Sequence, residues 1–384
     1  MTLAPSAPAV KNEVATGVQE KIDEGAAGYT LIDCDVHHIL GSLRDLLPYL
    51  EPAILHRIEP AIGAKAEARN NFQLPRRAYF HPFSTARVDT MDADGTNHAA
   101  IPQRVKEELL DRYDITYAIL MGNNLTTLSG MPDPDLAAGI ARAYNDWTDD
   151  VWIRFDRRFK HSIWVAPQDP VQAAAEIERW GDHPDVVQVA MPQMDLLLGK
   201  RHYWPIYEAA VRHNLPVALH VGAESAGLNG PQIAVGAPTY YIELQTGVIS
   251  IGINNVISLV FEGVFDRFPT LKVVLMEYGF TWLPGLMWRM DREWTSLRAE
   301  VPWVKRPPSE YILEHIRVGS QPLETPNLRH LHQTLEMMSA ERIMVFATDY
   351  PHWDFDDPAY VMQRLPKAMR RAIAVENART LYGL

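Results

Sequence analysis

The chain of 384 residues contains a single cysteine, Cys34, and no obvious apolar run of the length that spans a bilayer. One cysteine excludes an internal disulfide and is typical of a protein from a reducing cytoplasm. Residues 1–28 have neither the basic start nor the apolar stretch of a secretory signal, so we expect a mobile arm there. The sequence therefore predicts a cytoplasmic protein that does not enter a membrane.

Positive charge is also scarce, because 36 Lys and Arg residues face 48 Asp and Glu residues, which gives a net charge of -12. An acidic chain repels nucleic acid and anionic membranes, so we expect neither as a partner. Glycine-rich phosphate loops of the GxGxxG or Walker type follow none of the apolar segments, and no G-x-S-x-G sequence is present. The sequence thus offers neither a phosphate loop nor a serine nucleophile elbow.

Short apolar segments alternate with stretches of helical length, of which Pro170–Trp180 and Tyr203–Asn214 are the clearest. Strands that alternate with helices form parallel sheets, and eight such units favour a closed (β/α)8 barrel over an open sheet. We therefore predict an α/β fold, with one domain over residues 29–384. The eight predicted strands are Tyr29–Val36, Ile115–Gly122, His161–Pro167, Asp185–Pro192, Leu215–Gly222, Leu271–Gly279, His315–Pro322 and Arg342–His352.

The connection between the first two strands is unusually long, running from Leu40 to Tyr113. A connection that leaves the C-terminal end of a barrel strand lies on the active-site face. We therefore predict a helical lid over residues 40–113, in which Phe80, His81 and Arg87 line a substrate pocket. The alternative is a packed surface subdomain whose aromatic residues form a small core of their own.

Carboxylate and imidazole side chains stand at the C-terminal ends of several predicted strands, and in a barrel these ends converge above one mouth. Either group is a ligand for a borderline divalent metal. Taken alone, the first-strand residues fit a surface turn or hydrogen-bonded core groups as well as they fit a metal site. Together the converging groups favour a metal site; they are Asp35 and His37 on the first strand, His220 on the fifth, Glu277 on the sixth, and Asp349 with His352 after the eighth.

Side-chain alternation along the first strand predicts two distinct faces. Asp33, Asp35 and His37 would share the face that looks toward the site, while Cys34 would face away from it. A metal-independent enzyme would need another nucleophile, and a cysteine on the far face does not supply one. A binding protein that used the barrel without catalysis would lack some of the metal ligands, whereas all of the candidate ligands are present here.

Four stretches together resemble amidohydrolase-related family 2, the metal-dependent barrels that include aminocarboxymuconate semialdehyde decarboxylase. The stretches read DCDVH, YWPIYEAAVRHNLPVALH, LVFEGVFDRFPTLKVVLMEYGFTWLP and FATDYPHWD. The resemblance runs from about Tyr29 to Leu384 and implies an amidohydrolase-like TIM-barrel domain. It also implies one divalent ion, zinc as first choice and manganese as second, with the ligands Asp35, His37, His220 and Asp349.

The resemblance implies chemistry as well. The family's decarboxylases carry a histidine in an H-x-G setting at the end of the sixth strand, where this sequence has Glu277-Tyr278-Gly279. We therefore expect a hydrolase that uses a metal-activated water on a small cyclic or aromatic substrate, with Asp349, Glu277 and His352 as catalytic residues. The alternative is a non-oxidative decarboxylase of an aromatic or unsaturated acid. Arg317 is a candidate for binding a substrate carboxylate, and a homodimer is expected because the family often forms dimers.

One metal ion per chain is the first prediction. Relatives with two metals bridge them with a carboxylated lysine at the end of the fourth strand, and the fourth strand here reads VVQVAMP without a lysine. Elemental analysis of metal-replete protein should therefore give one divalent ion per chain. Two ions per chain, or none, would contradict the prediction.

Overall fold

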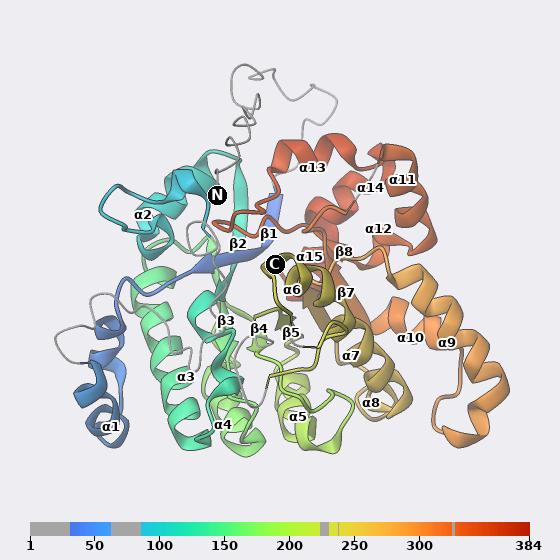
Figure 1. Cartoon of the computed structure of the whole chain (residues 1–384), viewed down its shortest axis with the longest axis horizontal. Coiled ribbons are helices and arrows are strands. Elements are labelled where there is room, and N and C mark those ends of the chain that lie inside the picture. Colours follow the sequence, from blue (N-terminus) through green and yellow to red (C-terminus); the bar gives the residue numbers. More distant parts are fainter. Residues whose placement is uncertain (1–30, 63–85, 223–229, 237, 325–326) are drawn as a thin grey trace, which may run out of the picture.

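The computed structural model describes residues 31–62, 86–222, 230–236, 238–324 and 327–384. Eight parallel strands pair in sequence order from β1 to β8, with helices around them (Figure 1). This confirms the predicted (β/α)8 barrel. The strands are β1 Leu31–His38, β2 Ile115–Gly122, β3 Phe159–Trp164, β4 Val186–Met191, β5 Val217–His220, β6 Val273–Met276, β7 Ile316–Gly319 and β8 Met344–Val345.

The barrel closes where the segment after β8 lies against β1. The His37 N–H donates to the Tyr350 carbonyl at 2.8 Å, and the Asp349 N–H donates to the Asp35 carbonyl at 3.1 Å. β8 itself has two residues, so these bonds lie beyond its C-terminal end. The backbones of two predicted ligand segments, far apart in the sequence, are therefore held directly against each other.

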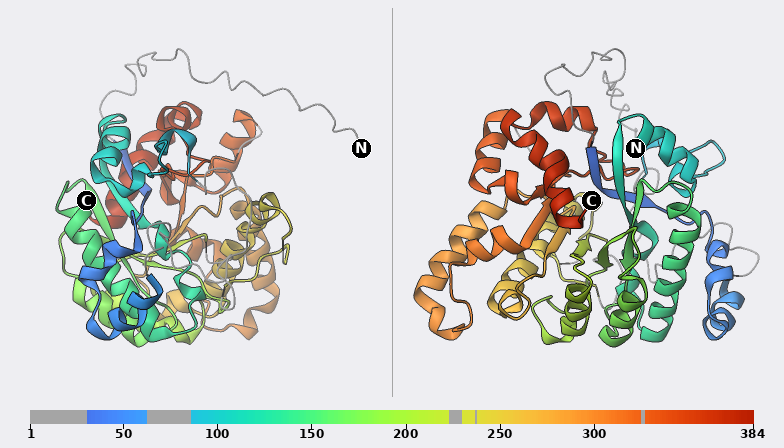
Figure 2. Two further views of the ribbon diagram at one scale, coloured as in Figure 1. Left: turned by 60° about the vertical axis from the view of Figure 1, so that its left-hand side comes forward. Right: turned by 180° about the vertical axis from the view of Figure 1, so that it is seen from behind.

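Helices follow the strands on the outside of the barrel. α4 occupies the predicted residues Pro170–Trp180 and begins after Asp169, whose carboxylate accepts hydrogen bonds from the N–H groups of Val171 and Gln172. The other main helices are α1 Pro52–Ile62, α2 Pro102–Val105, α3 Pro134–Thr148, α5 Trp204–Arg212, α6 Tyr241–Gly247, α7 Ile249–Phe261, α8 Val264–Arg267, α9 Leu283–Leu297, α10 Pro308–His315, α11 Leu328–Met337, α12 Ala340–Ile343, α13 Pro358–Arg364, α14 Lys367–Arg371 and α15 Asn377–Tyr382. Figure 2 shows the C-terminus returning to the region of β1.

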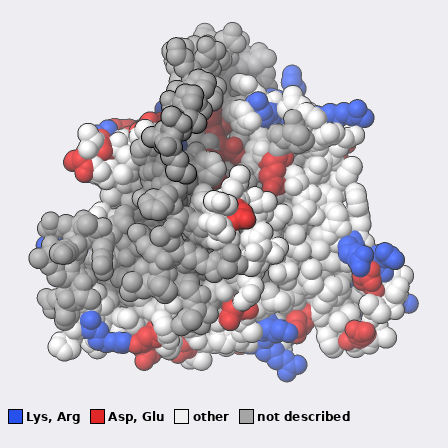
Figure 3. Space-filling model, viewed as in Figure 1, with Lys and Arg blue, Asp and Glu red and all other residues white. Residues whose placement is uncertain are grey.

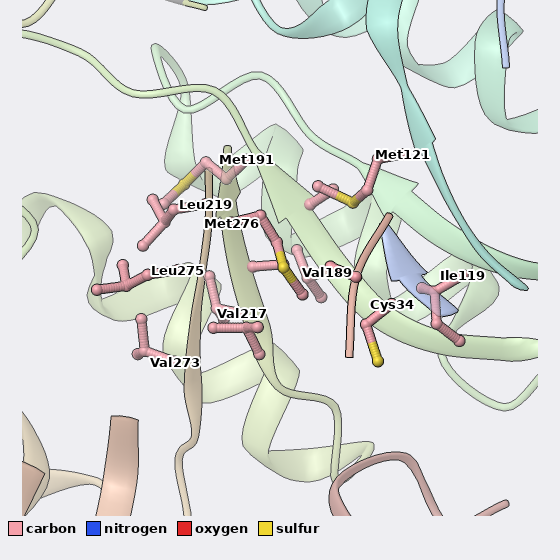
Figure 4. Packing of buried hydrophobic residues seen from close by; sticks show 14 of the residues in the cluster. Cys34, Ile119, Met121, Val189, Met191, Val217, Leu219, Val273, Leu275 and Met276 are labelled. Atoms are coloured by element: carbon pink, nitrogen blue, oxygen red, sulfur yellow. The ribbon is translucent and has the colours of Figure 1, made fainter. Parts of the chain in front are cut away.

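Alternating side chains separate the barrel interior from the layer beneath the helices. Figure 4 shows Met276 on one side of the strands and Leu219 with Leu275 on the other. A side chain at Gly319 would bring a Cβ atom to 3.0 Å from the Met276 sulfur, so the glycine leaves room for that methionine. His220 follows Leu219 and is opposite Met276 in the register of β5 and β6, so strand alternation places its side chain on the same side as Met276.

The predicted faces of β1 are wrong in one respect, because a bulge interrupts the alternation. Asp33 is opposite Ala118 and His37 is opposite Met121, so four steps on β1 correspond to three on β2. The extra residue reverses the facing between Asp33 and His37. Asp33 therefore does not share the face of His37, and alternation from His37 cannot be extended back to Cys34.

Different parts of the long connection after β1 lie in different places, one on the outside of the barrel and one beside the predicted site. The helix α1 packs against the outer face of α3, where a Cβ atom at Gly139 would lie 2.6 Å from Ile54. Farther along, Ala86 forms an isolated bridge with His352, beside the predicted site. The lid residues Phe80 and His81, and the predicted arm 1–28, lie outside the described residues, so the lid and the arm stay predictions.

One described stretch, Tyr241–Phe261 across α6 and α7, is long and apolar enough to cross a membrane by length and composition. The expectation that no apolar run approaches this length is therefore wrong for these residues. Within the protein 56% of that window is buried, as packing against the barrel requires. Figure 3 shows charged side chains of both signs around the margin of one face, rather than one continuous field of either sign among its described residues.

A polar network attaches the segment before β2 to the segment after β8. His98 Nδ1 lies 2.8 Å from Glu108 Oε1, and its Nε2 lies 3.1 Å from Asp92 Oδ1. The Tyr350 hydroxyl donates to Glu108 Oε2 at 2.8 Å. Although burial opposes a charge here, the hydrogen bonds to Glu108 and Asp92 raise the pKa of His98 above its usual value.

The raised pKa makes the contribution of His98 to stability depend on pH. The contribution is fully present below the unfolded value of about 6.5 and is lost as pH rises through the higher folded value. We expect the difference in unfolding free energy between wild type and His98→Gln to be larger at pH 6 than at pH 8.5. Urea unfolding of both proteins at each pH measures it, and a difference that grows with pH would contradict it.

Candidate metal centre

Five side chains from the ends of four strands converge at one point, and one ligand atom from each lies within 4.8 Å of all the others. His37 Nε2 is 3.0 Å from Asp349 Oδ1. His220 Nε2 is 3.3 Å from Asp35 Oδ2 and 3.4 Å from Glu277 Oε1. The cluster thus unites the four residues predicted as ligands with Glu277, which was predicted as a catalytic group.

The two imidazoles are oriented by hydrogen bonds on their outer nitrogens. His37 Nδ1 lies 3.0 Å from the Met121 carbonyl, and His220 Nδ1 lies 2.7 Å from the Val221 carbonyl. A carbonyl accepts only, so each Nδ1 carries the proton and donates it. In a neutral ring this leaves the Nε2 lone pair directed into the cluster, which is the tautomer that a metal ligand requires.

Several atoms that face into the cluster have no hydrogen-bond donor to pair with. Among the described residues, Asp35 Oδ1, Asp35 Oδ2, His37 Nε2 and His220 Nε2 are buried and have no hydrogen-bond partner. Buried acceptors that face other acceptors cost free energy unless a cation lies between them. The residues present therefore fit a divalent metal ion.

The charge balance points to the same conclusion. Although burial lowers it, the charges of Glu277 and Asp35 raise the pKa of His220 well above its usual value. The carboxylates therefore favour a positive charge between them. Binding of a divalent ion would supply that charge and release the proton from His220.

Asp349 and Glu277 compete for a single proton. Burial raises the pKa of Asp349 well above its usual range, and the charge of Glu277 adds to this rise. Burial acts on Glu277 in the same direction, but the charge of His220 and the polar contacts with Asp349 and His352 hold the pKa of Glu277 well below its usual range. Asp349 therefore takes up a proton more readily than Glu277 does, as expected when two adjacent carboxyl groups differ in their surroundings.

Backbone conformation is unusual at both of these carboxylates. Glu277 and Asp349 each have a φ of 62°, in the left-handed region that residues other than glycine rarely adopt. Such conformations persist only where surrounding structure enforces them, and they cluster at functional sites. Side-chain alternation from the strand therefore does not by itself place these two carboxylates.

The structure also locates the other predicted residues. His352 Nδ1 lies 2.5 Å from Asp349 Oδ1, so His352 contacts the cluster. The Arg87 guanidinium pairs with Asp89 and lies 4.4 Å from the centre of the Phe355 ring. Arg317 donates to the carbonyls of Glu314 and Ile316, at the start of β7 and away from its C-terminal end. Arg317 therefore points away from the mouth.

Three residues support the cluster in roles that the sequence did not indicate. Asp33 accepts hydrogen bonds from the Thr348 N–H at 3.0 Å and from its hydroxyl at 2.5 Å, immediately before Asp349. Gln321 Nε2 donates to Asp349 Oδ2 at 3.3 Å. The positions of Asp33 and Thr348, each two or fewer residues from a predicted ligand, were the available signal.

The amidohydrolase family model, Amidohydro_2, matches residues 32–384. This chain belongs to the amidohydrolase family. It is similar to a gamma-resorcylate decarboxylase of Polaromonas sp., with 27% identity over 294 residues that cover 72% of this chain and 86% of the relative. Family membership agrees with the resemblance seen in the sequence, and the chain is accordingly an enzyme of this superfamily with a candidate metal site.

Solved structures share the barrel fold. An amidohydrolase from Mycobacterium avium subsp. paratuberculosis has a TM-score of 0.66 and 18% identity, over 93% of this chain and 98% of the other. A dihydroxybenzoic acid decarboxylase from Polaromonas sp., solved with manganese and the inhibitor 2-nitroresorcinol, has a TM-score of 0.63 and 19% identity, with the same coverage. At these identities the likeness concerns the fold.

Two buried histidines at opposite ends of the strands provide a matched test of the cluster. His220 ends β5 inside the cluster, whereas His161 lies near the start of β3 and packs against Trp180. We expect His220→Ala to lose the bound metal and His161→Ala to keep it. Metal content after dialysis, measured on variants whose folding is verified by circular dichroism, checks this; equal retention would contradict it.

Proposed function

We propose that this enzyme is a metal-dependent, non-oxidative decarboxylase of a hydroxylated aromatic acid. The observation that carries the proposal is a buried cluster of five donors at the barrel mouth in a chain that matches gamma-resorcylate decarboxylases over 72% of its length. The sequence alone favoured hydrolysis and kept decarboxylation as the alternative. The relatives support the alternative better, since those of Polaromonas, Rhodococcus jostii and Rhizobium carry the same activity in their names.

The chain's own groups suit the steps of this reaction. Asp35, His37, His220 and Glu277 would hold a divalent ion, which supplies positive charge to a substrate carboxylate and to a neighbouring phenolic oxygen. Asp349, the fifth donor of the cluster, has a pKa raised by burial and by the charge of Glu277, and its carboxyl group would deliver a proton to the ring carbon that bears the carboxylate. The carbon–carbon bond then breaks, its electron pair restores the aromatic ring, and carbon dioxide leaves.

Two further features assist that proton transfer. His352 Nδ1 contacts Asp349 Oδ1 and would fix the direction of the carboxyl group. Asp35, His37 and Asp349 are fully buried, so bulk water has little access to the proton or to the charges that surround it. The hydrogen bond from the Thr348 N–H to Asp33 fixes the backbone next to Asp349.

A second candidate function is hydrolysis, and Glu277 is the observation that favours it. A carboxylate in this position would repel a substrate carboxylate unless positive charge offsets it, whereas it suits proton transfer during water attack. Glu277 Oε1 lies 3.4 Å from His220 Nε2 inside the donor cluster, so a divalent ion bound there would supply that offset. Decarboxylation is therefore compatible with Glu277 when the cluster binds a divalent ion.

We extend the proposal to the metal, which we expect to be manganese. Three of the five donors are carboxylates, and oxygen-rich sets suit manganese while imidazoles suit zinc. The decarboxylase from Polaromonas sp. solved with manganese has the same fold. Elemental analysis of protein grown with both metals present would distinguish manganese from zinc.

The reaction is tested with a panel of 2-hydroxybenzoic acids and of aryl lactones and amides, using manganese-loaded enzyme. We expect one carbon dioxide per arene formed from at least one acid. The control is the metal-depleted variant His220→Ala, which should release none. Hydrolysis of a lactone or amide without carbon dioxide release from any acid would instead support the second candidate.

The role of Glu277 gives a prediction about turnover. Glu277→Gln keeps the shape of the side chain but removes its charge and its ability to share the proton of Asp349. We expect the variant, assayed at a saturating manganese concentration, to lose at least about 10²-fold in turnover number on the true substrate. The exposed Glu262→Gln change is the control and should leave turnover unchanged. Equal turnover of Glu277→Gln and wild type would show a structural role only.

A further inference from the structure

The turn that follows Glu277 is held by a carboxylate from the neighbouring loop. Glu324, after β7, accepts three hydrogen bonds on its Oε2 atom. They come from the N–H of Phe280 at 3.0 Å, the N–H of Thr281 at 3.1 Å and the hydroxyl of Thr281 at 2.9 Å. A charged acceptor shared by three donors fixes their positions more strongly than a neutral acceptor does.

The backbone conformation of the same turn allows Glu324 to approach it. Glu277 has a φ of 62° and Gly279 a φ of 61°, so two left-handed residues lie within three positions. A Cβ atom at Gly279 would lie 2.5 Å from the carboxyl group of Glu324. Glycine therefore satisfies two conditions here: it adopts the conformation without strain, and it leaves space for Glu324.

Other residues of the loop that contains Glu324 contact the segment after β8. Ser320 exchanges hydrogen bonds with the backbone of Ala347, and Gln321 donates to Asp349. Residues 320–324, which follow β7, thus connect the ends of β6 and β8, the strands on either side of β7, after which Glu277 and Asp349 lie. Glu324 is the member of this loop that holds the Glu277 side.

We propose that Glu324 is a positioning residue for Glu277. It acts through the backbone of the turn Glu277–Thr281, whose strained start it stabilises, and so directs the Glu277 carboxylate toward His220 and the metal. The inference rests on the metal centre and holds for either candidate reaction. Metal affinity, rather than turnover, is accordingly the quantity that tests it.

The first experiment titrates manganese into metal-free protein by calorimetry. Glu324→Gln keeps the size of the side chain but replaces the carboxylate with a neutral amide, so the donors of the turn are held less firmly. We expect a dissociation constant about 10- to 100-fold higher than that of wild type, the range typical of groups that support metal ligands. Glu336→Gln, an exposed change on α11, is the matched control and should stay within about twofold of wild type.

A double-mutant cycle separates positioning from a general loss of stability. If Glu324 acts through Glu277, then Glu324→Gln should weaken manganese binding no further in a Glu277→Gln background. A general structural defect would weaken binding by the same factor in both backgrounds. That result, or an unchanged dissociation constant in Glu324→Gln or in Glu277→Gln, would overturn the proposal.

A milder variant tests the same contact without altering Glu324. Thr281 is exposed, and Thr281→Val removes only its hydroxyl donor. We expect weaker manganese binding than in wild type, by a smaller factor than for Glu324→Gln, with an unchanged circular dichroism spectrum. Thr295→Val also loses one hydroxyl hydrogen bond, to the Asp291 carbonyl, and should bind as wild type does. Equal affinities of these two threonine variants would contradict the proposal. Absence of carbon dioxide release would bear only on the reaction and would leave the titrations interpretable.

Discussion

Three carboxylates and two imidazoles meet at a largely buried point of the barrel mouth, and much of the surrounding structure follows from that constraint. Asp35 and Asp349 are fully buried, and Asp35 has no hydrogen-bond partner for either carboxylate oxygen among the described residues. Burial of that much negative charge is costly without a cation. The hydrogen bonds on the outer nitrogens of the histidines, the left-handed backbone at Glu277 and the Glu324 contact all direct these groups toward one another despite that cost.

The barrel provides the convergence, but not the final orientation. Parallel strands bring their C-terminal ends to one mouth, which is why strand ends read from the sequence located all five donors. Orientation depends on features after the strands: left-handed residues, short loops and carboxylates that accept backbone N–H groups. These features orient the site side chains with greater precision than strand geometry alone would.

The division between what the sequence predicted and what it did not has a physical basis. Periodic apolar segments predicted eight strands, and α4 was placed at its observed residues, because core packing imposes these patterns. The bulge in β1 was not predictable, since a single extra residue between Asp33 and Val36 leaves the apolar pattern almost unchanged. The Glu324 contact joins loops 43 residues or more apart, and no local spacing encodes it. Arg317 looked suitable for a substrate carboxylate by residue type, but its guanidinium bonds to carbonyls at the start of its strand. The homodimer and the cytoplasmic location stay predictions.

The closure between β1 and the segment after β8 also concerns the order of events during synthesis. Asp33 and Thr348 are 315 residues apart, and the donors Asp35 and Asp349 are nearly as distant. A nascent chain that still lacks Asp349 can present only part of the donor set, whatever its earlier strands have formed. A divalent ion that needs the full donor set would therefore bind only after the segment that follows β8 is in place, and it would then link the first and last strands of the barrel.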